Sequence, residues 1–305
     1  MVAMAVFEEQ FALSLARRAR LLSPSFFRRN LRNPVFVVGF NNSGKSTAIN
    51  LSRWIDELCI YPGEGNAELW FRGHFPWIES SAPVAPIWVA PDEFVRSVKD
   101  TCGGCFKSAR AQLGAYQWLV GGRNLLNDSG MLAALASDVA KDFPDAKFVH
   151  FIRDGRLAAY ITARLEWSRI IRSPSKYIEY YCPLSFHEVL RKMAEYWVWT
   201  IKRMDEVSAS MPGSVLELRY EDWWSDPFPM LASMSSFIGV SAPKQLNGNA
   251  PATDLTQHLL SEMSLDEISM LEKIVGETMR AKGYRPARVE FSHLSQHRKS
   301  NNAVS

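Results

Sequence analysis

The 305-residue sequence has only four cysteines, little net charge and no apolar run long enough to cross a membrane. A transmembrane helix needs about 20 consecutive, predominantly apolar residues, so no membrane span is expected. The 35 basic and 32 acidic residues give a formal net charge of +3. This balance argues against a general nucleic-acid binder but permits a local basic pocket. We therefore expect a small anionic partner and no nucleic acid.

The scarcity of cysteine also argues against a disulfide scaffold. A chain of this length buries a large core without cross-links, and its N-terminus has no secretion-signal pattern. We therefore expect a reducing, cytoplasmic compartment. Cys102 and Cys105 have the spacing of half a zinc site or of a redox pair. No second pair completes a zinc site, so we interpret them as two ordinary thiols at a glycine-rich turn and expect no metal there.

The most informative stretch is an apolar strand pattern, Pro34 to Val38, that runs into Gly39-Phe-Asn-Asn-Ser-Gly44-Lys45-Ser46. Gly39 and Gly44 permit positive φ, so that backbone N–H groups can converge on an anion at the start of the next helix. The spacing matches a phosphate-binding loop, in which Lys45 reaches phosphate oxygens and Ser46 can hold magnesium. A plain strand–turn–helix joint is the alternative interpretation.

A second strand pattern, Phe148 to Ile152, is followed by a helix pattern from Leu157 to Arg169. The fold class we predict is α/β: a single domain with a central, mostly parallel sheet flanked by helices, like the P-loop nucleotide kinases. Ligands bind at the carboxyl ends of such strands, so Arg153 is expected beside the loop if the two strands are neighbours. His150 is interpreted as a core histidine.

The domain is expected over residues 34–286, after a basic helical extension at 1–33 and before a polar tail at 287–305. The extension has apolar residues at helix-like spacing, including Phe11 and Leu15, together with several arginines. We interpret it as a helix packed on the domain with its arginines in water. The alternative is a basic amphipathic helix that makes peripheral contact with a membrane surface.

The segments between these patterns give coarser predictions. Helices are expected over Thr47–Leu58 and Val189–Met204, and Phe94–Leu126 is mostly helical before it closes in a strand pattern. The aromatic stretch 69–77 either lines an acceptor pocket or forms a satellite core. It contains His74, a candidate general base. Asp128 or Ser129 can cap the helix expected from Met131 to Phe143; that is the structural interpretation of Asp128.

Phe143-Pro-Asp-Ala-Lys-Phe148, followed by Ile152-Arg-Asp-Gly-Arg156, resembles the sulfotransferases that use 3′-phosphoadenosine 5′-phosphosulfate (PAPS). The upstream loop and Arg219-Tyr220-Glu-Asp…Asp226-Pro227 resemble further segments of that family. The resemblance extends from about Pro34 to Tyr284. It implies transfer of a sulfuryl group from PAPS to a hydroxyl or amine of a small-molecule, glycan or lipid acceptor, with no metal.

The resemblance also implies roles for individual residues. Lys45 would be the catalytic cation, with His74 or Asp128 as general base. Arg153 would hold the 3′-phosphate, Tyr220 would approach the adenine, and the loop would hold the 5′-phosphosulfate. The implied cofactor-binding set is Asn41, Asn42, Ser43, Gly44, Lys45, Ser46, Thr47, Arg153, Thr162 and Tyr220.

The chain departs from the family pattern at several positions. Asn42 stands where relatives have Lys or Arg, and Lys45 stands where they have Thr. Ile161 occupies the position of a Ser that follows the 3′-phosphate arginine in relatives. We therefore expect the loop cation at Lys45, with compensation by Thr162 or Arg156.

Two other functions fit the sequence. The first is an ATP- or GTP-dependent kinase or NTPase, in which Ser46 holds magnesium and Asp154, after the second strand pattern, provides the usual carboxylate. The second is a catalytically reduced sulfotransferase-like protein that serves as a binding module.

Overall fold

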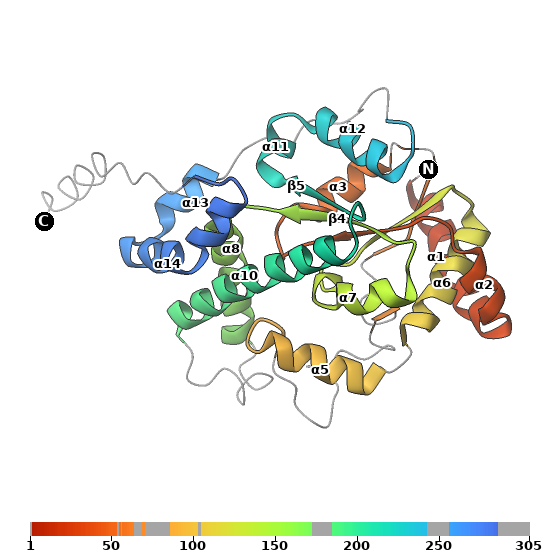
Figure 1. Ribbon diagram of the computed structural model, residues 1–305, viewed down its shortest axis with the longest axis horizontal. Helices are drawn as coiled ribbons and strands as arrows, with labels where there is room; N and C mark the ends of the chain where they lie inside the picture. The colour runs from red at the N-terminus through yellow and green to blue at the C-terminus, as the bar shows by residue number, and fades with distance from the viewer. Residues whose placement is uncertain are drawn as a thin grey trace, which may run out of the picture.

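Five parallel strands form the centre of the computed structural model, which describes residues 2–53, 55, 57–63, 69–70, 86–102, 105–172, 185–242 and 256–285. Figure 1 shows helices on both faces of this sheet, as the sequence predicts for an α/β fold. The strand order is β2-β3-β1-β4-β5, so β1 lies in the middle. The strands are β1 (Pro34–Val38), β2 (Leu58–Ile60), β3 (Asn124–Asp128), β4 (Lys147–Ile152) and β5 (Val215–Arg219).

Alternating side chains of the strands enter two separate hydrophobic clusters. Phe36 and Phe148 belong to the cluster on one face, together with side chains of α7 (Leu132–Asp142) and α10 (Phe186–Ser210). Val35, Val37 and Val149 belong to the other cluster, with α3 (Lys45–Ser52) and α12 (Pro227–Ile238). Both faces of these strands are therefore buried, which explains their continuous apolar sequences.

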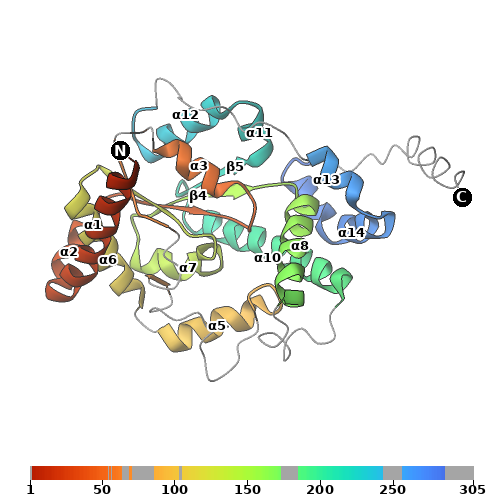
Figure 2. The same cartoon turned by 180° about the vertical axis from the view of Figure 1, so that it is seen from behind.

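At one end of the molecule, α1 (Val2–Leu22) and α2 (Pro24–Asn30) pack on α6 (Cys105–Val120). Figure 2 shows the three helices together, at the end opposite α13 (Thr256–Glu262) and α14 (Leu265–Ala281). Leu13 and Phe27 are buried at this contact. The crossing of α2 over α6 is close: a Cβ at Gly114 would lie 2.1 Å from the carbonyl oxygen of Phe27. The extension at 1–33 thus joins the main core.

The remaining described helices are α5 (Pro91–Cys102), α8 (Gly155–Arg172) and α11 (Tyr220–Ser225). α8 and α14 both pack against α10. The predicted inward face of α10 is confirmed, because Leu190, Met193, Trp197 and Ile201 are all buried. Capping boxes at Ser185–Glu188 and Ser264–Glu267 fix where α10 and α14 begin. No helix of the described ranges is both long enough and apolar enough to span a bilayer.

Two local predictions were wrong. The helix expected from Thr47 to Leu58 ends at Ser52, and Leu58 instead begins β2, a three-residue edge strand that pairs with β3. Asp128 is the last residue of β3 and does not cap α7, whose N-cap, Met131, has no side-chain cap. In both cases, pairing with a neighbouring strand outweighs the local helix signal.

Candidate functional site

The loop after β1 is held in a conformation that its glycines and one asparagine permit. Gly44 has φ of 95°, and a Cβ there would lie 2.3 Å from Cδ2 of Tyr220. Gly39 has φ of 143°, and a Cβ there would lie 2.3 Å from the carbonyl oxygen of Phe151. Asn42 adopts a left-handed φ of 60°, which asparagine tolerates better than most residues. The loop then leads directly into α3 at Lys45.

The carboxyl ends of the central strands meet at the same edge of the sheet, because all the strands are parallel. The loop follows β1, Asp128 ends β3, Arg153 follows β4, and Tyr220 follows β5. A cavity of about 710 Å³ opens there, and it is lined by every residue of the expected cofactor-binding set except Ser43. Ser43 is buried. The fold therefore brings together residues that lie more than 170 positions apart in the sequence.

Lys45 is buried at the start of α3, and it also lines this cavity. Its Nζ donates a hydrogen bond to the carbonyl oxygen of Phe40 at 2.8 Å. Its stem passes close to Gly130, where a Cβ would lie 3.2 Å from Cε of Lys45. A cation is thus fixed beside the loop that exposes backbone N–H groups, and the two together favour an anion.

Arg153 brings a second buried cation to the cavity, with only 8% of its surface exposed. Its Nη1 donates to the carbonyl oxygen of Asn42 at 3.0 Å. Its guanidinium lies 4.2 Å from the centre of the Tyr220 ring. Its Nε has no hydrogen-bond partner among the described residues. Since buried donors are normally paired, this N–H suits an acceptor atom of a bound anion.

Asn42 and Thr162 connect the loop to α8. The Asn42 Nδ2 donates to Thr162 Oγ1 at 2.9 Å, and that hydroxyl donates to the carbonyl oxygen of Ala158 at 2.7 Å. Asn42 therefore fixes the position of the loop and contributes no charge. Ile161, the neighbour of Thr162, lines the same cavity.

Of the two expected general bases, Asp128 ends β3 at the same edge of the sheet but does not line the cavity, and His74 lies outside the described residues. Asp128 is buried, and its Oδ2 lies 3.5 Å from the hydroxyl of Ser46. His150 is a buried core residue, as predicted. Burial lowers its pKa, although its Nδ1 lies 3.4 Å from Glu217 Oε2. Burial therefore favours the neutral form of the imidazole. His150 does not line the cavity.

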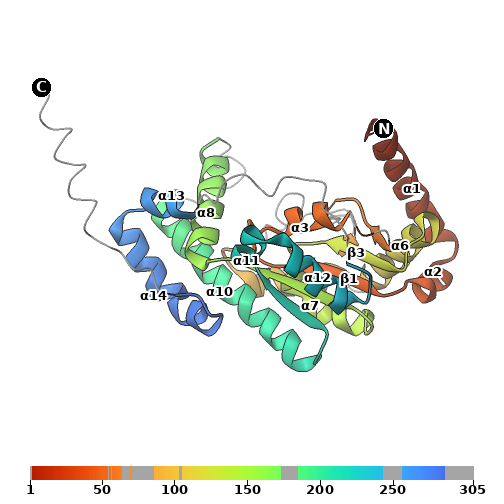
Figure 3. The same cartoon turned by 90° about the horizontal axis from the view of Figure 1, so that it is seen from above.

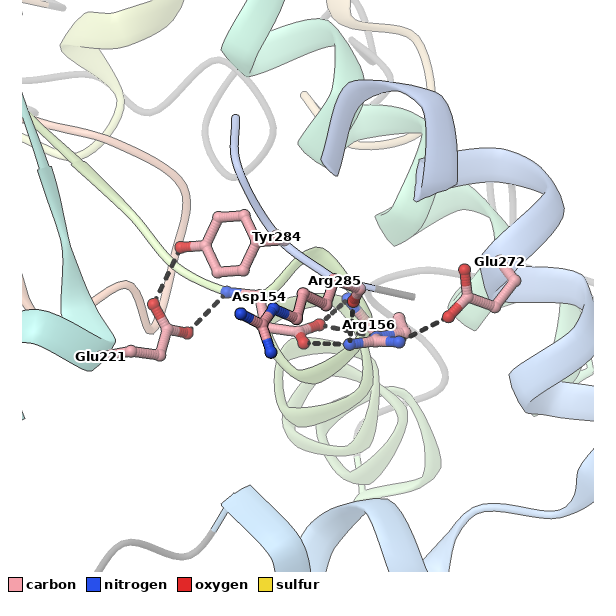
Figure 4. A network of polar contacts seen from close by, with 6 residues as sticks. All are labelled: Asp154, Arg156, Glu221, Glu272, Tyr284 and Arg285. Atoms are coloured by element: carbon pink, nitrogen blue, oxygen red, sulfur yellow. Dashed lines mark hydrogen bonds and ion pairs between the residues drawn. The ribbon is translucent and has the colours of Figure 1, made fainter. Parts of the chain in front are cut away.

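Asp154 and Arg156 form a buried ion pair, which Figure 4 shows. Asp154 accepts from Arg156 Nη2 at 2.5 Å and from its Nε at 3.0 Å. Arg156 also donates to Glu272 of α14 at 2.5 Å. Neither residue lines the cavity. The expectations that Asp154 holds magnesium and that Arg156 compensates at the 3′-phosphate are therefore wrong, because the two opposite charges neutralise each other inside the fold.

Glu221 extends this network to the C-terminal end of the described chain. One carboxylate oxygen accepts from the backbone N–H of Asp154 at 2.9 Å, and the other accepts from the hydroxyl of Tyr284 at 2.8 Å. Burial raises the pKa of Glu221. The network thus attaches the end of β4 to α11 and to the residues after α14.

Other residues that line the cavity were not in the expected cofactor-binding set. Glu166 and Arg169 line it from α8, where Arg169 Nη1 donates to Glu166 Oε2 at 3.0 Å. They follow Thr162 at helical spacing, and this periodicity is the sequence signal that could have placed them on the same face. No local pattern distinguishes the apolar wall from ordinary core. Its members are Trp88, Met131, Ile161, Leu165 and Met193. The side chains of Cys102 and Cys105 lie outside the described part of the chain.

Comparison with known proteins shows which family and which structures the chain is similar to. Residues 105–244 match the model of the sulfotransferase family, a segment that includes Asp128, Arg153, Thr162 and Tyr220 but not the loop after β1. None of the curated protein sequences compared matches the chain.

Two solved structures share the fold. Sulfotransferase STF9 from Mycobacterium avium superposes with a TM-score of 0.56 at 13% identity, over 92% of this chain and 86% of that one. The sulfotransferase domain from the curacin biosynthetic pathway superposes with a TM-score of 0.51 at 14% identity, over 85% of this chain and 100% of that one. The chain therefore resembles the sulfotransferase family in sequence over residues 105–244, and it shares the α/β fold, with a five-stranded parallel sheet, of these sulfotransferases.

Proposed function

We propose that this protein transfers a sulfuryl group from PAPS to a hydroxyl or amine of an acceptor. The observation that carries the proposal is that Arg153, a buried cation, lines the same cavity as the loop after β1. Its Nε has no hydrogen-bond partner among the described residues. A site with a glycine-rich loop and a separate buried arginine suits a nucleotide with phosphate groups at two positions. The match of residues 105–244 to the sulfotransferase family model supports this choice.

The residues present fit PAPS. The backbone N–H groups of the loop and Lys45 would hold the 5′-phosphosulfate. Arg153 would hold the 3′-phosphate, with Thr162 beside it, and Tyr220 would contact the adenine. Bound PAPS would supply the sulfuryl group and a phosphate leaving group.

The chain's own residues then provide positioning and charge. The Lys45 ammonium stabilises negative charge at the loop, a contribution that is large where water is excluded. The Asp128 carboxylate accepts a proton from the acceptor at one of its oxygens. The apolar wall formed by Trp88, Met131 and Leu165 suits an acceptor with an apolar portion. A small molecule, a glycan or a lipid can meet that description.

A second candidate function is favoured by Ser46 and Asp128. A hydroxyl at the start of α3 and a carboxylate at the end of the adjacent strand, 3.5 Å apart, are the two protein groups that hold magnesium in P-loop NTPases. Asp128 thus takes the role that the sequence suggested for Asp154. This geometry supports an ATP- or GTP-dependent kinase or NTPase.

Thermal-shift measurements separate the two functions, since a ligand that binds only the folded state raises the midpoint of unfolding. Adenosine 3′,5′-bisphosphate should raise the midpoint without metal, and 5′-AMP should raise it less because it lacks the 3′-phosphate. Stabilisation only by ATP with magnesium would favour the second function and overturn the first. Stabilisation by neither nucleotide would point to the sulfotransferase-like binding protein. A direct assay then follows release of the bisphosphate from PAPS in the presence of acceptor alcohols and amines.

A further inference from the structure

Large apolar side chains are exposed at one end of the molecule. Among the described residues, eleven such side chains are exposed, and seven of them lie on α1, α2 and the last turn of α6. These seven are Phe11, Leu15, Leu21, Leu22, Phe26, Trp118 and Val120. Single exposed apolar residues are ordinary, whereas a concentration of them marks an interaction surface.

In the described part of α1 the buried face is mainly alanine, and most of the larger apolar residues face outward. Leu13 and Ala16 are buried against α6, whereas Phe11 is 63% exposed and Leu22 is 87% exposed. At about 100° per residue, Phe11, Leu15 and Leu22 lie within about 40° of one another on the helix. Figure 3 shows α1 standing out from the body of the molecule. The described part of α1 thus packs on the domain as expected, and it leaves a second apolar face exposed.

The exposed apolar residues of α2 and α6 form a small aromatic cluster. Phe26 and Trp118 are both exposed, and their rings meet edge to face with centroids 6.3 Å apart. Phe26 lies only four residues beyond Leu22 in the chain, so the cluster is close to the end of the α1 stripe. We call the α1 stripe and this cluster together the N-terminal surface.

The charge around the N-terminal surface is mainly positive after Glu8 and Glu9. Between Gln10 and Asn33 the sequence has six arginines and no acidic residue. Arg18 falls within the α1 stripe, and both Arg18 and Arg29 are exposed. Arginines that alternate with large apolar residues suit a surface with anionic groups above an apolar layer, because the stem of the side chain stays in apolar surroundings while the guanidinium reaches the anions.

We propose that the N-terminal surface binds the anionic face of a lipid bilayer, with α1 lying in the headgroup region. A second copy of the chain fits this surface less well. A symmetric dimer would place the same arginine-rich surface against itself, and like charges at short range repel. Anionic lipid instead attracts each arginine near the membrane surface. This inference goes beyond the proposed reaction and does not depend on it.

The test is cosedimentation of the full chain with lipid vesicles. Binding to vesicles that contain phosphatidylglycerol is expected, with little binding to pure phosphatidylcholine and with weakening as salt is raised. The triple variant Phe11→Ser, Leu15→Ser, Leu22→Ser should bind about tenfold or more weakly. The pair Arg18→Gln, Arg29→Gln should reduce binding in the same direction.

A matched control removes exposed apolar side chains elsewhere. The variant Phe228→Ser, Leu265→Ser, at positions 44% and 51% exposed on α12 and α14, should bind vesicles like the unmodified chain. Because all five positions are exposed, both variants should keep the unmodified midpoint of unfolding. Equal vesicle binding by the triple variant and the unmodified chain would overturn the proposal. A lack of binding to anionic vesicles would also overturn it. If light scattering then showed a dimer that the triple variant breaks, the surface would bind a second copy of the chain instead of lipid.

Discussion

The guanidinium of Arg153 lies 4.2 Å from the centre of the Tyr220 ring while its Nη1 donates to the carbonyl oxygen of Asn42 at 3.0 Å. One side chain therefore connects three segments: the loop after β1, the end of β4 and the start of α11. The contact with the ring face and the bond to the carbonyl fix the direction of the guanidinium. This fixed direction is the basis of the first prediction.

Replacement of Arg153 by Ala should weaken binding of adenosine 3′,5′-bisphosphate by roughly 10- to 150-fold, the loss of a charge-assisted hydrogen bond. Arg153→Lys should recover only part of the affinity, because an ammonium cannot stack on Tyr220 and reach Asn42 in the same way. Isothermal titration calorimetry measures both. Arg191→Ala, which removes an exposed ion pair with Glu195 on α10, is the control and should bind normally. Unchanged affinity of Arg153→Ala would remove Arg153 from the nucleotide site.

Gly44→Ala should damage both stability and nucleotide binding. The new Cβ would lie 2.3 Å from Tyr220 Cδ2, in addition to the strain of a φ of 95°. Gly121→Ala is the matched control, because Gly121 has a similar φ of 90° with nothing within 4 Å. It should therefore show the strain alone, about 1–2 kcal/mol. Urea titrations give the loss in free energy of unfolding for Gly44→Ala and for Gly121→Ala.

The contact with Tyr220 can be tested separately within the same series. Adding Tyr220→Ala to Gly44→Ala should restore part of the lost free energy of unfolding, since the clash is removed while the strain at residue 44 stays. If Gly44→Ala costs no more than Gly121→Ala, the close contact between loop and ring is not present in solution.

Arg156→Met should destabilise the protein by about 3–5 kcal/mol, because it removes the cation that neutralises the carboxylates of Asp154 and Glu272 in a largely buried place. The control on the same helix is Arg164→Met, which removes a more exposed pair with Glu262 and should cost less than about 1 kcal/mol. Urea titrations of the two variants and the unmodified chain measure these losses in the free energy of unfolding. Similar costs for the two variants would show that the network of Figure 4 does not stabilise the fold.

The neutral, buried His150 should make stability depend on pH. Burial lowers its pKa in the folded protein, so the unfolded chain binds the proton more readily. Stability is therefore complete above the ordinary histidine pKa of about 6.5 and falls as the pH drops below it, by at most about 1.4 kcal/mol per pH unit. The groups around it are Glu217, Lys282 and Asp205. The pKa of Glu217 is lowered, so this carboxylate stays ionised throughout that window.

His150→Gln keeps a hydrogen-bond donor but does not titrate. Its free energy of unfolding should fall less between pH 7.5 and pH 5.5 than that of the unmodified chain. Urea titrations at the two pH values measure the difference, which isolates His150 from the other histidines. Parallel losses in the two proteins would contradict a lowered pKa for His150.

Several features of this protein were predictable because they depend on short stretches of sequence. The glycines at positions 39 and 44 follow an apolar strand pattern. Few backbone conformations suit both the buried strand and the glycine-containing turn after it. Strand patterns before Arg153 and Tyr220 place these residues at the same edge once the sheet is parallel. The buried face of α10 follows from its 3.6-residue periodicity.

Other features depend on residues that are distant in sequence. Asp154 looked like a free carboxylate at the end of a strand, but that carboxylate accepts from Arg156. Arg156 also bonds Glu272, 116 residues away, and the backbone N–H of Asp154 donates to Glu221, 67 residues away. β2 has only three residues, and its pairing with β3 replaced a predicted helix. The proximity of Asp128 to Ser46 arises because β3 lies beside β1, which no local pattern specifies.

The sequence by itself determined the backbone of the loop after β1, the alternation of strands and helices, and the basic, apolar character of residues 10–33, because these follow from dihedral preference, periodicity and composition. Only the tertiary structure decided which charges are neutralised and which face the cavity, and which side of α1 is left outside. The reason is physical: the environment of a charge or an apolar side chain is set by neighbours within a few ångströms, and the strand order brings those neighbours from far along the chain.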